Sequence, residues 1–200
     1  MFDLPIVPVL VVNDASKAQM LGRVLVENGL PIAEVTLRTP SALEVISEMS
    51  QIEGLCVGAG TVLTAADAEA AVKAGASFLV SPGLHEEAIV YAQSSNIPIV
   101  PGITSPTEVA QAMALGLEMV KFFPAEAVGG IPLLKALGSV YPNMKVMPTG
   151  GISPANVKDY LALPNVIACG GSWMAPANLV DAGDEEELGR LIREAVALVQ

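Results

Sequence analysis

The feature that most constrains the fold is an alternation, repeated along the chain, of short β-branched runs with longer segments of helical periodicity. The runs that predict strands span residues 6–12, 32–37, 55–59, 78–80, 97–100, 119–123, 145–148 and 166–169. The segments that predict helices span residues 15–28, 41–50, 65–74, 86–94, 106–115, 132–137, 154–161 and 185–199. Such alternation is typical of parallel sheets whose strands are joined by helices. Eight strand–helix units predict an α/β fold of the (β/α)8 TIM-barrel type.

A doubly wound open sheet is the alternative. Its dinucleotide-binding members carry a glycine-rich turn after the first strand. Here that turn reads Val12-Asn13-Asp14-Ala15 and contains no glycine, which favours the barrel. Composition does not shift along the chain and no long polar linker divides it, so residues 1–200 are expected to form a single domain.

The net charge of −11 disfavours nucleic acid and anionic membrane surfaces as partners. No apolar run approaches the roughly 20 residues that a membrane-spanning helix needs. The N-terminus, Met1-Phe2-Asp3-Leu4-Pro5, has no basic stretch before its apolar run, which argues against a signal peptide. We therefore expect a cytoplasmic protein.

Metal-binding residues are scarce. The chain has one histidine, His85, and two cysteines, Cys56 and Cys169, far apart in sequence. A zinc site needs more ligands at shorter spacings, so no metal site is predicted. A hydrolytic triad would have to use His85 as its base, and a surface role beside two glutamates at a helix start fits that residue better.

Lys121 lies in the apolar segment Met119-Val120-Lys121-Phe122-Phe123, which predicts a buried strand. Burying an ammonium group without a partner is costly, and desolvation favours loss of its proton. A neutral amine is a nucleophile that forms imines with carbonyl compounds. The alternative is a structural lysine that pairs with a buried carboxylate or extends to the rim.

Glu34, Thr36 and Arg38 share one face of the second expected strand, because side chains alternate along a strand. If this face and the face bearing Lys121 both point inward, Glu34 and Lys121 meet across the interior. The pair is then either a structural ion pair or an amine with a proton carrier beside it, and a resting enzyme can contain both.

Loops rich in small residues follow the expected strands, where barrel active sites assemble. They are Gly58-Ala59-Gly60-Thr61, Ser81-Pro82-Gly83, Pro101-Gly102-Ile103-Thr104, Thr149-Gly150-Gly151-Ile152-Ser153 and Gly170-Gly171-Ser172-Trp173. Small residues let a substrate approach the backbone. Glycine-rich turns after the last two strands form the phosphate site of many barrels, with ordinary tight turns as the alternative.

Taken in order, these segments resemble the bacterial KDPG (2-keto-3-deoxy-6-phosphogluconate) aldolases, which often also act on 4-hydroxy-2-oxoglutarate. The resemblance covers nearly the whole chain and is most specific in Lys121-Phe122-Phe123-Pro124-Ala125-Glu126. It implies a (β/α)8 barrel, a class I aldolase without metal or organic cofactor, pyruvate as a product, and a homotrimer. Many relatives carry an extra helix before the first strand that covers the bottom of the barrel, whereas here the first expected strand begins at Ile6.

The resemblance also implies roles for individual residues. Lys121 matches the Schiff-base lysine and Glu34 the general acid/base. The remaining matched residues bind substrate: Arg38 and Thr61 at the pyruvyl carboxylate, Pro82 and Phe123 along the carbon chain, and Gly150, Gly151 and Ser172 at the phosphate. Alternatives are an aldolase for the phosphogalactonate isomer, a phosphate-binding isomerase or synthase that forms no imine, a metal-dependent class II aldolase, which the scarcity of histidine disfavours, and a barrel that binds sugar phosphates without catalysis.

Overall fold

The computed structural model describes residues 4–200. Residues 1–3, on which the argument against a signal peptide partly rests, lie outside the described range. The strands are β1 (Ile6–Leu10), β2 (Ile32–Thr36), β3 (Cys56–Gly60), β4 (Phe78–Val80), β5 (Ile99–Val100), β6 (Gly102–Ile103), β7 (Met119–Phe122), β8 (Lys145–Pro148) and β9 (Cys169–Gly171). The helices are η1 (Ala15–Lys17), α1 (Ala18–Glu27), α2 (Ala42–Ser50), α3 (Ala65–Lys73), α4 (Glu86–Ser94), α5 (Pro106–Ala114), α6 (Gly130–Val140), α7 (Val157–Leu161), α8 (Ala177–Ala182) and α9 (Glu185–Val199).

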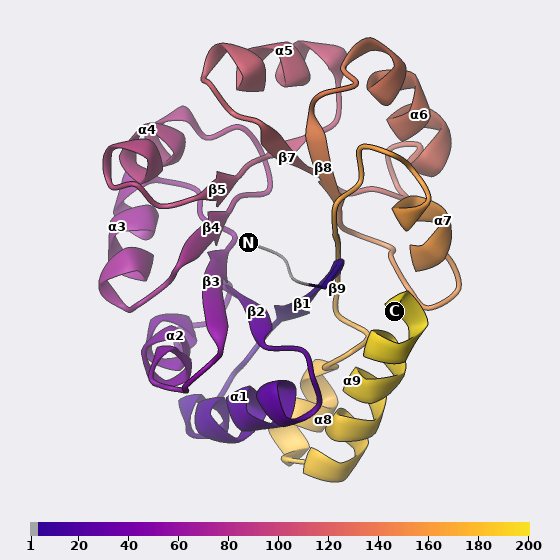
Figure 1. Ribbon diagram of the computed structural model, residues 1–200. Helices are drawn as coiled ribbons and strands as arrows, with labels where there is room; N and C mark the ends of the chain where they lie inside the picture. The colour runs from indigo at the N-terminus through magenta and orange to yellow at the C-terminus, as the bar shows by residue number, and fades with distance from the viewer. Residues whose placement is uncertain (1–3) are drawn as a thin grey trace.

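The strands lie around a common centre and the helices cover them from outside (Figure 1). Over residues 4–200 they form two parallel sheets, one of six strands in the order β5-β4-β3-β2-β1-β9 and one of three strands in the order β6-β7-β8. Parallel neighbours need helical crossovers, which explains the alternation in the sequence. Parallel pairing also brings the C-terminal ends of the strands to one edge.

The first interruption between the two sheets falls at Pro101. One fifth strand was expected over residues 97–100. Instead, β5 covers Ile99–Val100 and pairs with β4, and a second short strand, β6, begins at Gly102 and pairs with β7. Proline has no backbone N–H for a ladder. Its carbonyl is still used, because the N–H of Lys121 donates to Pro101 O over 2.7 Å.

The second interruption separates β8 from β9. Val146 donates its N–H to Asn165 O and accepts from the N–H of Ile167, but Pro148, two residues further along, has no N–H with which to continue. Within residues 4–200, the strand pairing here is reduced to the isolated bridges Val146–Val166 and Thr149–Gly170. The prediction of a closed (β/α)8 barrel is therefore wrong: the described chain forms a curled six-stranded half-barrel and a separate three-stranded sheet.

Two further elements differ from expectation. The last strand was expected over residues 166–169 but spans Cys169–Gly171, so Gly170 and Gly171 lie within it and not in a turn. The helix α8 was not predicted. It has 6 residues, fewer than two helical turns, so its sequence is too short to show a helical periodicity.

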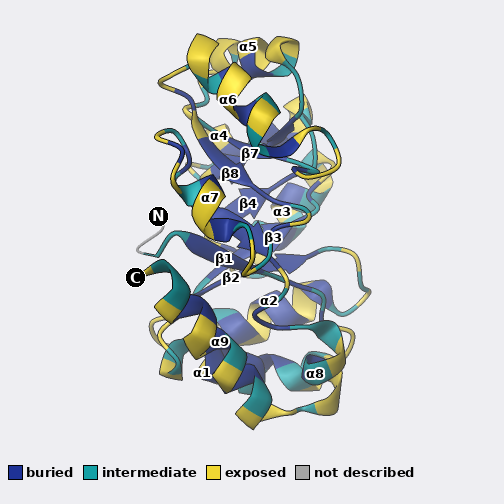
Figure 2. Cartoon of the chain, turned by 90° about the vertical axis from the view of Figure 1, so that its right-hand side faces the viewer, coloured by how far each residue is buried: buried dark blue, intermediate teal, exposed yellow. Residues whose placement is uncertain are grey.

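Burial follows the layers. The strands are almost entirely buried, whereas exposed residues gather on the outer faces of the helices (Figure 2). Thr64 and Ser105 form capping boxes at the starts of α3 and α5, respectively, which satisfy backbone N–H groups that have no partner within the helix. Among the described residues, no helix is long and apolar enough to cross a membrane.

Candidate active site

Lys121 and Glu34 form an ion pair in the interior, with Lys121 Nζ 3.2 Å from Glu34 Oε1. Lys121 is 5% exposed and Glu34 is 0% exposed. They come from the centres of β7 and β2, which belong to different sheets. The predicted meeting of the two side chains across the interior is confirmed.

The second oxygen of the Glu34 carboxylate, Oε2, is buried and has no hydrogen-bond partner within residues 4–200. A buried acceptor without a donor is rare in folded proteins. Gly60 makes room for this carboxylate, since a Cβ at position 60 would lie 2.3 Å from Glu34 Oε1. Glu34 therefore has one oxygen on the amine and one available for a further proton donor.

Arg38 and Thr61 lie just beyond the C-terminal ends of β2 and β3, which pair with each other. Arg38 is exposed, and its Nε donates to Thr36 Oγ1 over 3.2 Å. Thr61 has a φ of 61°, which is unusual for a residue other than glycine. A strained backbone of this kind is common at ligand-binding sites.

Phe123 follows β7, and the centre of its ring lies 5.1 Å from Lys121 Nζ. The face of an aromatic ring attracts a cation and also presents an apolar surface beside the amine. Pro82 lies in the loop after β4. Its carbonyl packs so tightly on β6 that a Cβ on Gly102 would come within 2.0 Å of it. Both residues are half-buried beyond the ends of their strands.

Gly150 and Gly151 follow β8, and their φ values of 97° and 81° are accessible chiefly to glycine. Ser172 follows β9 and is exposed. The bridge between Thr149 and Gly170 brings these two loops side by side at the same edge as the other candidates. Seven of the nine predicted site residues thus lie just beyond the C-terminal ends of strands, and Lys121 and Glu34 lie within β7 and β2.

Comparison with known proteins decides the family. The family model for KDPG and KHG aldolase matches residues 1–191. The chain belongs to this aldolase family. The KHG/KDPG aldolase of Escherichia coli is 44% identical over 193 residues, which cover 96% of this chain and 91% of that protein. The chain is therefore a carbon–carbon lyase of the aldolase type.

Two solved structures agree closely with this fold. The 2-keto-3-deoxy-6-phosphogluconate aldolase of Zymomonas mobilis with 3-phosphoglycerate has a TM-score of 0.93 at 42% identity, covering 98% of this chain and 92% of that one. The KDPG aldolase of Legionella pneumophila has a TM-score of 0.92 at 39% identity, covering 96% and 94%. Its structure holds pyruvate as a covalent carbinolamine intermediate.

The structure of this aldolase also reveals polar groups that the sequence analysis did not single out. Thr149 Oγ1 and Trp173 Nε1 are buried and have no hydrogen-bond partner among the described residues. Thr149 directly follows β8 and begins the loop that was noted in the sequence for its two glycines. Trp173 packs against the backbone of Gly171, where a Cβ would meet the ring at 1.8 Å.

The structure explains the need for glycine at position 151 differently from what the sequence suggested. From the sequence, small residues in these loops were expected to allow close approach of a substrate. A Cβ on Gly151 would instead meet Glu126 Cγ at 2.5 Å, so a protein side chain already fills that space. Gly60 and Glu34 repeat the arrangement. These glycines let one segment of the site pack directly on another.

The cysteines and potential metal ligands of the described residues do not form a second reactive site. Within residues 4–200, no group of three or more His, Cys, Asp or Glu side chains is placed to hold a metal ion. Cys56 and Cys169 are not joined by a disulfide. Burial raises the pKa of the Cys169 thiol to about 12, which keeps it protonated and unreactive.

Proposed function

We propose that this chain is a class I aldolase that cleaves 2-keto-3-deoxy-6-phosphogluconate to pyruvate and glyceraldehyde 3-phosphate, and also cleaves 4-hydroxy-2-oxoglutarate to pyruvate and glyoxylate. The observation that carries the proposal is the buried Lys121–Glu34 pair, at 3.2 Å, with one carboxylate oxygen unpaired. The family membership supports it, as does the carbinolamine held by the Legionella pneumophila enzyme.

In this proposal Lys121 is the nucleophile and Glu34 moves the protons. Transfer of a proton from Lys121 Nζ to Glu34 frees the nitrogen lone pair, which attacks the C2 ketone of the substrate. Glu34 then delivers a proton to the carbinolamine oxygen, and water leaves to give an iminium ion. The 3.2 Å separation in the resting site suits the first of these transfers.

Cleavage uses the iminium ion as an electron sink. Glu34 Oε2, directly or through a water molecule, accepts the proton of the C4 hydroxyl. The C3–C4 bonding pair moves toward the iminium, the aldehyde leaves and an enamine remains. Protonation of the enamine at C3 and addition of water at C2 release pyruvate and restore the free amine.

The remaining residues are proposed to hold the substrate. Arg38 and Thr61 bind the pyruvyl carboxylate, since a guanidinium group suits a carboxylate. Phe123 and Pro82 border the carbon chain. Gly150, Gly151 and Ser172 bind the phosphate, which is supported by the exposure of Gly151 and Ser172.

An assay of pyruvate release tests the proposal. The substrates are the phosphogluconate derivative, its phosphogalactonate isomer and 4-hydroxy-2-oxoglutarate. The proposal expects the highest kcat/KM on the phosphogluconate derivative and unchanged activity in EDTA. Release of pyruvate chiefly from the phosphogalactonate isomer would replace the proposed substrate, and no release from any of the three would refute the aldolase reaction.

We also propose that the protein is a cytoplasmic homotrimer. The support is the family resemblance, together with a net charge of −11 that disfavours anionic membrane surfaces. Sedimentation velocity tests the oligomer directly: a single species with three times the mass of the chain is expected, and a monomer would contradict it.

A further inference from the structure

Glu126 and Tyr160 meet beside the glycine loop, and neither takes part in the steps proposed above. Tyr160, in α7, is 0% exposed and donates its hydroxyl to Glu126 Oε1. Burial, with the Glu126 carboxylate as a further cause, raises the pKa of the Tyr160 hydroxyl well above its usual range. The hydroxyl therefore remains a donor across the physiological pH range.

Backbone bonds tie the segment after Lys121 to the same glycine loop. The N–H of Ala125 donates to Thr149 O over 2.8 Å, and the N–H of Glu126 donates to Gly150 O over 3.1 Å. The stem of Glu126 occupies the space that a side chain on Gly151 would need. From there its carboxylate reaches Tyr160, in the helix that follows the loop.

The glycine loop needs such support. Gly150 and Gly151 both have positive φ, and a glycine backbone adopts many other conformations with little penalty. A loop that binds an anion through its backbone must hold its N–H groups in one arrangement before the ligand arrives, because ordering it later weakens binding. Two glycines cannot supply that restraint themselves.

We propose that Glu126 and Tyr160 are positioning residues, which hold the Gly150–Gly151 loop in the conformation that binds the substrate phosphate. This inference rests on the phosphate site proposed above. The hydrogen bond joins the segment bearing Lys121 to α7, so it clamps the glycine loop between the imine end of the site and the following helix.

The direct test is Tyr160→Phe, which removes only the hydroxyl. The KM for the phosphorylated substrate should rise about tenfold, the typical effect of losing one hydrogen bond to a charged group, while kcat changes little. The KM for 4-hydroxy-2-oxoglutarate, which lacks a phosphate, should not change. Tyr141→Phe is the matched control, because the Tyr141 hydroxyl donates to Pro106 O away from the glycine loop.

Variants of the exposed partner keep the test independent of any folding defect in Tyr160→Phe. Glu126→Ala should reproduce the tenfold rise in KM, whereas Glu126→Gln keeps an acceptor for the hydroxyl and should stay within about threefold of wild type. The double variant Glu126→Ala/Tyr160→Phe should be no worse than either single variant, because both remove the same bond.

Three outcomes would overturn the inference. Equal losses on both substrates would mean that the pair supports the imine end or the whole fold. Unchanged KM values in folded Tyr160→Phe and Glu126→Ala would mean that the loop needs no clamp. A wild-type enzyme that shows no preference for the phosphorylated acid would refute the phosphate site itself, and this failure is visible before any variant is made.

Discussion

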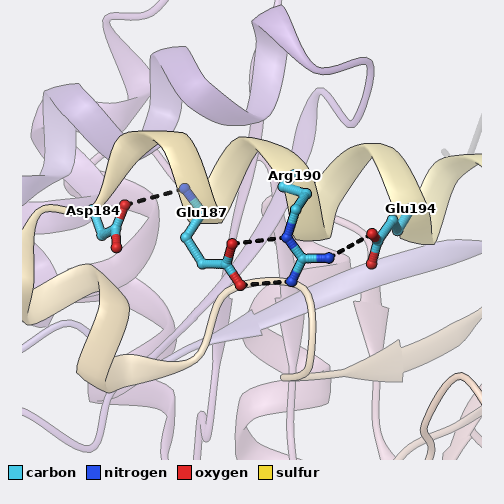
Figure 3. A network of polar contacts seen from close by, with 4 residues as sticks. All are labelled: Asp184, Glu187, Arg190 and Glu194. Atoms are coloured by element: carbon cyan, nitrogen blue, oxygen red, sulfur yellow. Dashed lines mark hydrogen bonds and ion pairs between the residues drawn. The ribbon is translucent and has the colours of Figure 1, made fainter.

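The ion pairs on the surface of α9 are shorter than the pair at the centre of the molecule. Arg190 bonds Glu187 at 2.6 Å and Glu194 at 2.5 Å, and Asp184 caps the same helix by accepting from the N–H of Glu187 (Figure 3). Lys121 and Glu34 are 3.2 Å apart. Judged by distance alone, the surface ion pairs would be the stronger interactions.

The difference in burial favours the opposite order of electrostatic strength. The side chains of Arg190, Glu187 and Glu194 are 48%, 38% and 61% exposed, so water and salt screen their attraction. The side chains of Lys121 and Glu34 are 6% and 1% exposed. The surface pairs are three and four residues apart on one helix, whereas Lys121 and Glu34 are 87 positions apart in the chain. The fold has to form before the interior pair can exist, which is the arrangement expected of a chemical site.

Removal of the amine should have the largest effect. Lys121→Met keeps a long unbranched side chain but cannot form an imine, so kcat should fall by roughly 10⁴-fold or more, as when other enzymes lose their nucleophile. Steady-state release of pyruvate measures this. Lys145→Met is the matched control, because Lys145 is exposed at the start of the neighbouring strand β8. Comparable loss in both variants would contradict a special role for the buried lysine.

Replacement of the carboxylate should come next. Glu34→Gln preserves the shape but cannot carry a proton, so kcat should fall by about 10²–10⁴-fold while KM changes less. Glu118→Gln, an exposed carboxylate just before β7, should behave like wild type. Near-normal kcat in folded Glu34→Gln would show that another group or water moves the proton.

Glu108 is an intermediate case between the interior and the surface. This half-buried carboxylate accepts from the N–H and hydroxyl groups of Thr104 and Ser105 over 2.7–2.9 Å. Burial alone would raise the pKa of Glu108, but these hydrogen bonds outweigh burial and hold its pKa below the usual 4.5. Glu108→Ala should lower the free energy of unfolding by about 1 kcal/mol at pH 7.

The pH dependence of that difference follows from the sign of the shift. A carboxyl group whose pKa is lowered by folding stabilises the native state above its unfolded pKa, and this contribution is lost as the pH falls through the folded pKa. Urea unfolding should therefore show wild type and Glu108→Ala converging below pH 4.5. A difference that stays constant down to pH 3 would mean that packing, and not the carboxylate, accounts for the loss.

Loss of the surface ion pairs on α9 should have the smallest effect of the changes considered. Arg190→Ala removes both ion pairs on α9, yet the melting temperature should change by no more than about 2 °C, and by less at high salt. A thermal scan at low and high ionic strength measures it. If Arg190→Ala lowered the melting temperature as much as Glu108→Ala does, the exposed ion pairs would contribute more stability in this protein than solvent screening allows.

The sequence predicted those parts of the fold that depend on local periodicity. Strands β2, β4, β7 and β8 and helices α4 and α9 lie where alternation and helical spacing indicated. Local periodicity does not predict whether the sheet closes into a barrel, because closure depends on individual backbone hydrogen bonds between neighbouring strands. The prolines at positions 101 and 148 remove the N–H donors of two of them, and runs of apolar residues do not reveal that.

The same distinction between regular strands and irregular loops applies to the candidate site. The contact between Glu34 and Lys121 followed from alternation along two strands, because both strands are regular at those residues. The packing of Glu126 against Gly151 lies between irregular loops, and sequence spacing does not predict loop geometry. The sequence therefore revealed the reacting end of the site better than the loops that surround it.

The central claim is that the buried lysine, and no other, forms a covalent imine. Incubation of the intact protein with pyruvate and borohydride, followed by peptide mapping, measures this directly. The peptide that contains Lys121 should gain the mass of a reduced pyruvyl group, and no such mass should appear on Lys145 or the other exposed lysines. An adduct on a different lysine, or no adduct while pyruvate is still released from the substrate, would contradict it.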